Sequence, residues 1–149
     1  MAQGPYVGRQ RTYNTIGADM EAIVDRTEQK MIDVVRASIR DVVNEMQQPV
    51  AKGGRMRVDT GFLRASGRAS TTGFPSGVGQ RPAEGTFTYD GEAVNAVLLS
   101  LNFGDTFYWG WVANYAPYRE LYDGFMEAAL QNWSRIVAFN IDTVNKGSR

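Results

Sequence analysis

The chain has 149 residues, of which 43% are hydrophobic and 21% charged, and these proportions suit one compact folded domain. It contains neither cysteine nor histidine, which excludes disulfides, thiolate nucleophiles, Cys/His zinc sites and catalysis by histidine. Sixteen basic and sixteen acidic side chains give a formal net charge of zero, which disfavours a dedicated nucleic-acid-binding domain. We therefore expect no enzyme, no cofactor and no metal.

The N-terminus is predicted to be an extended arm. Residues 1–16 combine glycine, proline and arginine with no acid, and they show no helical or strand period. Two interpretations are open: a disordered terminus, or an extension that orders on a neighbouring subunit. Residues 1–13 lack the apolar run of a secretory signal, and no stretch approaches the roughly 18 apolar residues of a membrane helix. We expect residues 17–149 to form a single domain, made and used in the cytoplasm without a membrane.

A long amphipathic helix is predicted over residues 18–48. Its apolar side chains recur every three or four residues from Met20 to Met46 and so share one face, and Pro49 ends the helix. At about 1.5 Å per residue it would run roughly 45 Å, longer than a domain of this size needs for packing. Part of the apolar face is therefore expected to contact another chain.

A basic segment follows the helix, between residues 52 and 81, with Asp59 as its single acid. Its basic residues are Lys52, Arg55, Arg57, Arg64, Arg68 and Arg81. Three interpretations are open: a solvated surface, salt bridges to an acidic patch of a neighbouring subunit, or contact with DNA phosphates. The neutral overall charge makes the DNA interpretation the weakest.

Residues 58–66, with the sequence VDTGFLRAS, lie within this basic segment and are predicted to form a pivot between helix and sheet. Asp59 or Thr60 can cap the N-terminus of a short helical turn. Phe62 and Leu63, which follow Gly61, would then point into the core.

The middle of the chain is predicted to form strands. Strand character appears at residues 68–72 and again at 86–89, and the glycine- and proline-rich residues 74–85 between them form a long loop. Asp90 and Gly91 indicate a turn. Residues 96–103 and 106–115 are rich in β-branched and aromatic side chains and are separated by Gly104 and Asp105, which predicts a β-hairpin.

A turn at residues 120–124 is predicted to lead into a second amphipathic helix, from Phe125 to about Asn145. The order of elements predicts the α+β class. In this fold an antiparallel sheet is packed by a long N-terminal helix and a C-terminal helix, with an extended N-terminal arm and a long Gly/Pro loop. Alternation along residues 107–111 favours core packing of the aromatic side chains over a base-stacking platform. The predicted core and pivot residues are Asp59, Thr60, Gly61, Phe62, Leu63, Trp109, Trp111, Phe125 and Trp133.

Two patterns resemble reactive sites without meeting their requirements. Glycines at positions 73, 77 and 79 suggest a phosphate loop, but no Lys-Ser or Lys-Thr follows them. Glu120, Asp123 and Glu127 could form a carboxylate pair for acid-base chemistry or metal binding. Their position beside the predicted start of the last helix is already explained by the helix dipole.

Taken in order, the long first helix, the VDTGFLRAS element, the segment YAPYRE from Tyr115 to Glu120, and the closing Phe125-Met126-x-x-Ala129 with Trp133 resemble a family of neck proteins of long-tailed phages. That family includes the tail-completion protein Z of phage lambda. The resemblance spans about residues 18–140 and rests on short motifs. Two positions depart from the family pattern. Arg119 stands where relatives often have an apolar residue, and Tyr122-Asp123-Gly124 runs almost directly into the last helix.

The resemblance implies a structural virion protein of the head–tail junction. Such a subunit forms a ring with copies of itself, usually a hexamer, between the head-completion or connector proteins and the tail tube, and double-stranded DNA passes through the lumen. A tail terminator that caps the tail tube is the alternative, because it shares a similar α+β build. A DNA-contacting module is a weaker one.

We expect the arm and the loop at residues 73–85 to order on adjacent subunits, and the arginines to face carboxylates across that contact or at the junction with the next ring. The interface candidates are Tyr6, Arg9, Arg11, Tyr13, Arg55, Arg57, Arg64, Arg68, Phe74 and Arg81.

Overall fold

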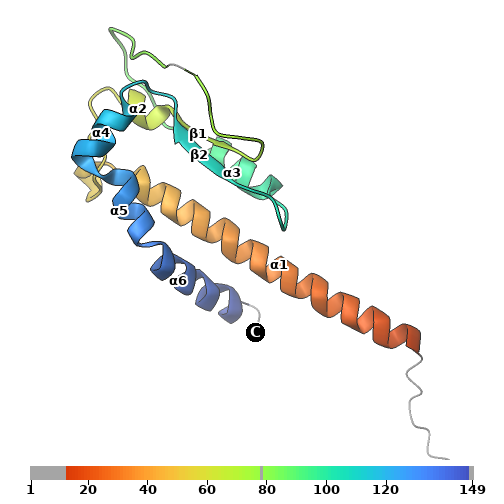
Figure 1. Cartoon of the computed structure of the whole chain (residues 1–149). Coiled ribbons are helices and arrows are strands. Elements are labelled where there is room, and N and C mark those ends of the chain that lie inside the picture. Colours follow the sequence, from red (N-terminus) through yellow and green to blue (C-terminus); the bar gives the residue numbers. More distant parts are fainter. Residues whose placement is uncertain (1–12, 78, 148–149) are drawn as a thin grey trace, which may run out of the picture.

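The computed structural model describes residues 13–77 and 79–147 and has the predicted α+β fold (Figure 1). Its elements in chain order are α1 (Tyr13–Met46), the 3-10 helix η1 (Val50–Lys52), α2 (Phe62–Ala65), β1 (Gly67–Ser70), α3 (Gly91–Ser100), β2 (Tyr108–Trp111), α4 (Ala116–Asp123), α5 (Phe125–Gln131) and α6 (Trp133–Lys146). Within the described residues no helix is both long and apolar enough to cross a membrane.

Helix α1 is the axis of the molecule. It has 34 residues and begins at Tyr13, inside the segment predicted to be an arm, so at about 1.5 Å per residue it runs roughly 50 Å. Only its C-terminal half is packed by other elements, and its N-terminal half extends past all of them (Figure 1). Every residue from Ile16 to Gln29 is exposed.

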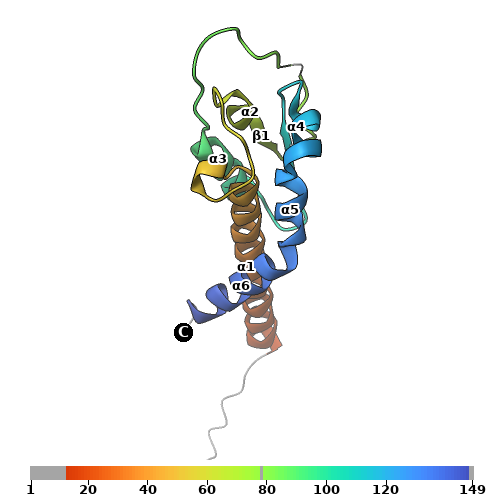
Figure 2. The same cartoon turned by 90° about the vertical axis from the view of Figure 1, so that its left-hand side faces the viewer.

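The C-terminal helices pack along α1, with α5 on one side of it and α3 on the other (Figure 2). Ile136 and Ala129 contribute to a core cluster with Val42 of α1. The buried amide of Asn140 donates to the Asp41 carboxylate at 2.9 Å, which fixes α6 against α1. The single last helix predicted from the sequence is two helices, because the chain changes direction at Asn132.

The sheet consists of β1 and β2, which pair antiparallel from Gly67 opposite Trp111 to Ser70 opposite Tyr108. Trp109 and Trp111 pack against the core cluster, whereas the Tyr108 ring lies edge-on to Phe74, with the ring centres 5.0 Å apart. The predicted alternation of aromatic faces is therefore confirmed. Phe74, an interface candidate, has a partner within its own chain and is still 75% exposed.

The predicted hairpin is wrong, because residues 91–100 form helix α3 and β2 pairs with β1 instead. Asp90 caps this helix by accepting hydrogen bonds from the backbone N–H groups of Glu92 and Ala93. At the other end Arg36 donates to the carbonyl of Leu101 at 2.6 Å. With both ends capped by side chains and apolar residues three or four apart on one face, the helix outcompetes the strand.

Two further local predictions are wrong. Residues 86–89 are not a strand. They lie in irregular backbone, where the Phe87 N–H donates to the Thr60 carbonyl at 2.8 Å. The predicted turn at residues 120–124 is the second half of α4, which has Pro117 in its first turn and ends at Gly124, a glycine with φ +62°. Proline is favoured in the first turn of a helix, where its missing N–H has no partner to lose.

The core has two clusters joined by Trp111. The first contains Val43 and Met46 of α1 with Leu98 of α3, and the second contains Met56, Leu63 and Phe125. Leu63, Phe125 and the two sheet tryptophans therefore belong to the core as predicted, and Phe62 packs against the second cluster. Trp133 does not belong to it, because it is 38% exposed at the start of α6. Asp59 is exposed too and contributes no core packing.

Candidate functional site

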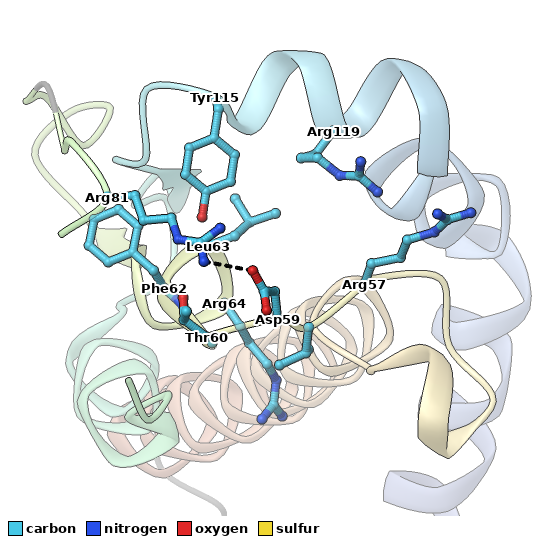
Figure 3. A pocket seen from close by; sticks show the side chains of 11 residues that line it. Arg57, Asp59, Thr60, Phe62, Leu63, Arg64, Arg81, Tyr115 and Arg119 are labelled. Atoms are coloured by element: carbon cyan, nitrogen blue, oxygen red, sulfur yellow. Dashed lines mark hydrogen bonds and ion pairs between the residues drawn. The ribbon is translucent and has the colours of Figure 1, made fainter. Parts of the chain in front are cut away.

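Two of the short motifs that carry the family resemblance, VDTGFLRAS and YAPYRE, meet at one pocket of about 290 Å³ (Figure 3). Residues 58–64 supply one wall, and Tyr115 with Arg119 supplies the other. Arg57 and Arg81 complete the lining. The pocket thus joins segments that are more than 50 positions apart in the sequence, and it is the candidate functional site of this chain.

Gly61 shapes the floor of this pocket. Its φ of +83° lies in the left-handed region that favours glycine, and a Cβ at this position would stand 2.2 Å from the carbonyl oxygen of Phe87. The turn at Gly61 starts α2, which buries Leu63. The capping prediction is wrong for Asp59, whose carboxylate binds Arg81, while the Thr60 hydroxyl accepts from the Phe62 N–H at a long 3.4 Å.

Arginines dominate the charge of the pocket. Arg81 contacts the Asp59 carboxylate at 2.6 Å, as the dashed line in Figure 3 marks. Beside the pocket, the Asp123 carboxylate is only 4% exposed and binds Arg119 at 2.5 Å and Arg57 at 3.4 Å. The Arg119–Asp123 ion pair lies within α4, and the Arg57–Asp123 ion pair joins α4 to the basic segment. Two of the predicted interface arginines, Arg57 and Arg81, therefore face carboxylates of their own chain.

Arg64 points away from the centre of the pocket (Figure 3). Its Nε donates to the Gln47 carbonyl at 2.7 Å, and its guanidinium lies over the Tyr89 ring, 5.2 Å from the centre. The Gln47 side chain is almost fully buried, donates to the Arg64 carbonyl at 2.9 Å and accepts from Trp111 Nε1 at 2.9 Å. Gln47 thus ties α1, α2 and β2 together behind the pocket. The sequence does not indicate this role of Gln47, since one glutamine at a helix end carries no distinctive signal.

Two tyrosines near the pocket and Gln47, Tyr115 and Tyr89, have raised pKa values. Burial raises the pKa of Tyr115, whose ring faces into the pocket in Figure 3, and nearby Arg81 opposes part of the rise. Burial likewise raises the pKa of Tyr89, against the opposing effects of a hydrogen bond with Gln47 and of the Arg64 charge. Both phenols are therefore neutral at physiological pH and serve as hydrogen-bonding and packing groups.

The carboxylates considered for acid-base chemistry have structural contacts. Glu120 accepts hydrogen bonds from the backbone N–H groups of Met126 and Glu127, at 2.8 and 2.9 Å, and so caps the N-terminus of α5. Asp123 is held by its two arginines. Among the described residues no group of three or more acidic side chains could hold a metal ion.

Of the remaining interface candidates, Tyr13 and Arg68 do not line the pocket. Tyr6, Arg9 and Arg11 fall outside the described residues, and Tyr13 is the first residue of α1. Arg68 donates to the carbonyls of Ala65 and Gly67.

The described part of the 73–85 loop is attached to its own chain. The Gly79 N–H donates to the Val112 carbonyl, and the Gly79 carbonyl accepts from the Asn114 N–H, each at 2.9 Å.

Comparisons with protein-family models, with curated proteins and with solved structures found no significant match to this chain.

Proposed function

We propose that the chain is a structural subunit of the head–tail junction of a tailed phage, a tail-completion protein that forms a ring with copies of itself. The observation that carries the proposal is the unpacked half of α1. Ile16, Met20 and Ile23 are each at least 45% exposed on a helix that extends past the rest of the molecule (Figure 1). A monomer gains nothing by holding such side chains in water, so a partner surface is expected to cover them.

The motif residues support the same proposal. The VDTGFLRAS and YAPYRE elements, which resemble the neck-protein family, line one pocket, and the Phe62 and Tyr115 rings lie with their centres 6.3 Å apart. The Arg57–Asp123 ion pair joins residues directly beside the two elements. Such packing keeps the two elements in a fixed relative position, which a ring subunit needs in order to make the same contacts in every copy. In the proposed assembly the subunit resides in the virion between the head connector and the tail tube, and double-stranded DNA passes through the lumen without sequence-specific contacts.

The proposal is tested by locating the protein in particles. A tagged copy should be found by cryo-electron microscopy as a ring at the neck, and light scattering of the purified chain at high concentration should show a closed oligomer. The position of the ring along the neck distinguishes a tail-completion protein from a tail terminator. Particles that contain no copy of the chain, or a protein that turns over peptidoglycan or nucleotides, would contradict the proposal.

A further inference from the structure

The described residues present a second exposed apolar surface, at the opposite end of the molecule from the projecting N-terminal half of α1 (Figure 1). It is a groove of about 800 Å³ along α4 and α5, lined by Leu121, Tyr122, Met126 and Leu130. Leu121 and Tyr122 are 79% and 80% exposed. We infer that this groove receives the projecting half of α1 from a second copy of the chain, an inference that rests on the proposed ring.

The projecting part of α1 has the shape that such a groove requires. Ile16, Met20, Ile23, Thr27 and Met31 follow one another at intervals of three or four residues, so they form one continuous stripe of the helix. The Thr27 hydroxyl donates to the carbonyl of Ile23 at 2.8 Å, so this polar group is satisfied within the helix. A straight apolar ridge and an open apolar groove are complementary, as in other helix-in-groove contacts.

Charge favours this pairing over contact between two α1 helices. Residues 16–35 carry five carboxylates and two basic side chains, so two such segments side by side would repel each other. At the edge of the groove, Arg55 belongs to the lining and Lys52 lies three positions before it. Neither makes an ion pair with a described residue. The lining also holds three acids, Glu120, Asp123 and Glu127. Two backbone N–H groups bind the Glu120 carboxylate, and Arg57 and Arg119 bind Asp123, so the groove is far less acidic than residues 16–35.

The two surfaces also have the right relation for a ring. They are different surfaces on one chain, so their contact is heterologous, and such contacts close into rings when the rotation between copies allows it. The groove lies beside the candidate pocket, since α4 contributes to both through Arg119 and Glu120. Docking of α1 would therefore stabilise α4, and with it the candidate pocket, of the receiving copy.

The absence of cysteine permits a direct test. One preparation carries Ile23→Cys and a second, of different mass, carries Leu121→Cys; Met20 with Leu130 serves as a second pair. After mild oxidation of the mixture we expect disulfide-linked dimers that contain one chain of each kind, and a ladder of larger species when both cysteines are placed in one chain. Phe139→Cys, on an equally exposed apolar residue of α6, should not link to Leu121→Cys.

Association should also depend on the stripe in the cysteine-free chain. Met20→Asp with Ile23→Asp should weaken association by roughly tenfold or more, because charges would enter the apolar groove. The same variant should keep its circular dichroism and melting temperature, since both side chains are exposed in the monomer. Phe139→Asp is the matched control and should associate normally.

Homodimers of Ile23→Cys alone in place of mixed dimers would overturn the inference, because they would show stripe-to-stripe contact. So would the absence of mixed dimers both in concentrated protein and in purified particles. The proposed function fails separately. A cross-linked ring that is missing from the neck would support the interface and contradict the proposed function. A ring found at the neck without these cross-links would support the proposed function and contradict the interface.

Discussion

The indole nitrogen of Trp111 donates a hydrogen bond to the side-chain oxygen of Gln47, and this 2.9 Å bond ties β2 to the end of α1. The same glutamine donates to the Arg64 carbonyl. Its side chain thereby satisfies one polar group of β2 and one of α2 at the point where the two core clusters meet. Because an unpaired buried polar group costs about 1 to 3 kcal/mol, this contact is central to the fold.

We therefore expect Gln47→Met to lower the free energy of unfolding by roughly 2 to 4 kcal/mol, since it leaves the Trp111 N–H and the Arg64 carbonyl without their partner. Urea unfolding followed by tryptophan fluorescence measures this loss. Gln29→Met is the matched control, because Gln29 is exposed on α1 and its amide donates to Asp33 of the same helix. Equal stability of the two variants would show that the Gln47 contacts are not needed.

Gly61 gives a second prediction. Gly61→Ala should destabilise the chain by roughly 2 kcal/mol or more, because its φ of +83° strains any side chain and the new Cβ would collide with the Phe87 carbonyl. Gly73→Ala is the control, since a Cβ there meets no atom within 4 Å. Thermal melting of both variants decides the matter, and a tolerant Gly61 would mean that the turn at the pocket floor is not rigid.

Helix α3 offers a test of the main disagreement between sequence and structure. Asp90→Ala removes the carboxylate that accepts hydrogen bonds from the Glu92 and Ala93 N–H groups. It should therefore lower the free energy of unfolding by about 1 kcal/mol and speed amide hydrogen exchange in α3. Glu84→Ala removes a carboxylate from the preceding loop and should have little effect. A β-strand at residues 96–103 would instead be insensitive to residue 90.

The sequence predicts the elements whose pattern is long or whose partners are local. The period of α1 repeats over many turns, and the alternation of Trp109 and Trp111 correctly assigns their sheet face. α3 was missed because a ten-residue apolar segment fits a buried strand as well as a helix. Asp90 followed by Gly91 indicates a turn, although the same residue type also caps helices.

The site was predicted only in part, for a related reason. The motif residues 58–66 and 115–120 stand out in the sequence, but their meeting at one pocket depends on packing that no local pattern encodes. The sequence predicts that these arginines face carboxylates of another subunit. The carboxylates that bind Arg57 and Arg81 belong to the same chain, 66 and 22 positions away from them, and such distant pairs cannot be deduced from spacing.

The raised pKa of Tyr115 predicts how stability depends on pH. The unfolded chain has the ordinary tyrosine pKa of about 10, so above that pH the unfolded state loses this proton before the folded state does. The contribution of the partly buried phenol is therefore complete below pH 10 and declines as the pH rises through the folded-state pKa. Tyr115→Phe should flatten part of this alkaline loss, measured as melting temperature between pH 9 and 11.5. Tyr118→Phe, on an exposed ring, is the control and should leave the alkaline curve as in the parent chain.

The last prediction separates two aromatic residues that the sequence places together in the core. Phe125 is 2% exposed between Trp111 and Leu63, and its ring lies edge-on to Trp111 with the ring centres 5.0 Å apart. Phe125→Ala should therefore cost roughly 3 to 5 kcal/mol, the range for emptying a buried aromatic site. Trp133 is 38% exposed, so Trp133→Ala removes less buried surface and should cost clearly less. Denaturant unfolding of both variants, followed by circular dichroism, gives the order. If Trp133→Ala were the more damaging change in the monomer, α6 would pack on α1 through a different face. If it impaired only assembly, the exposed part of its ring would belong to a contact between copies.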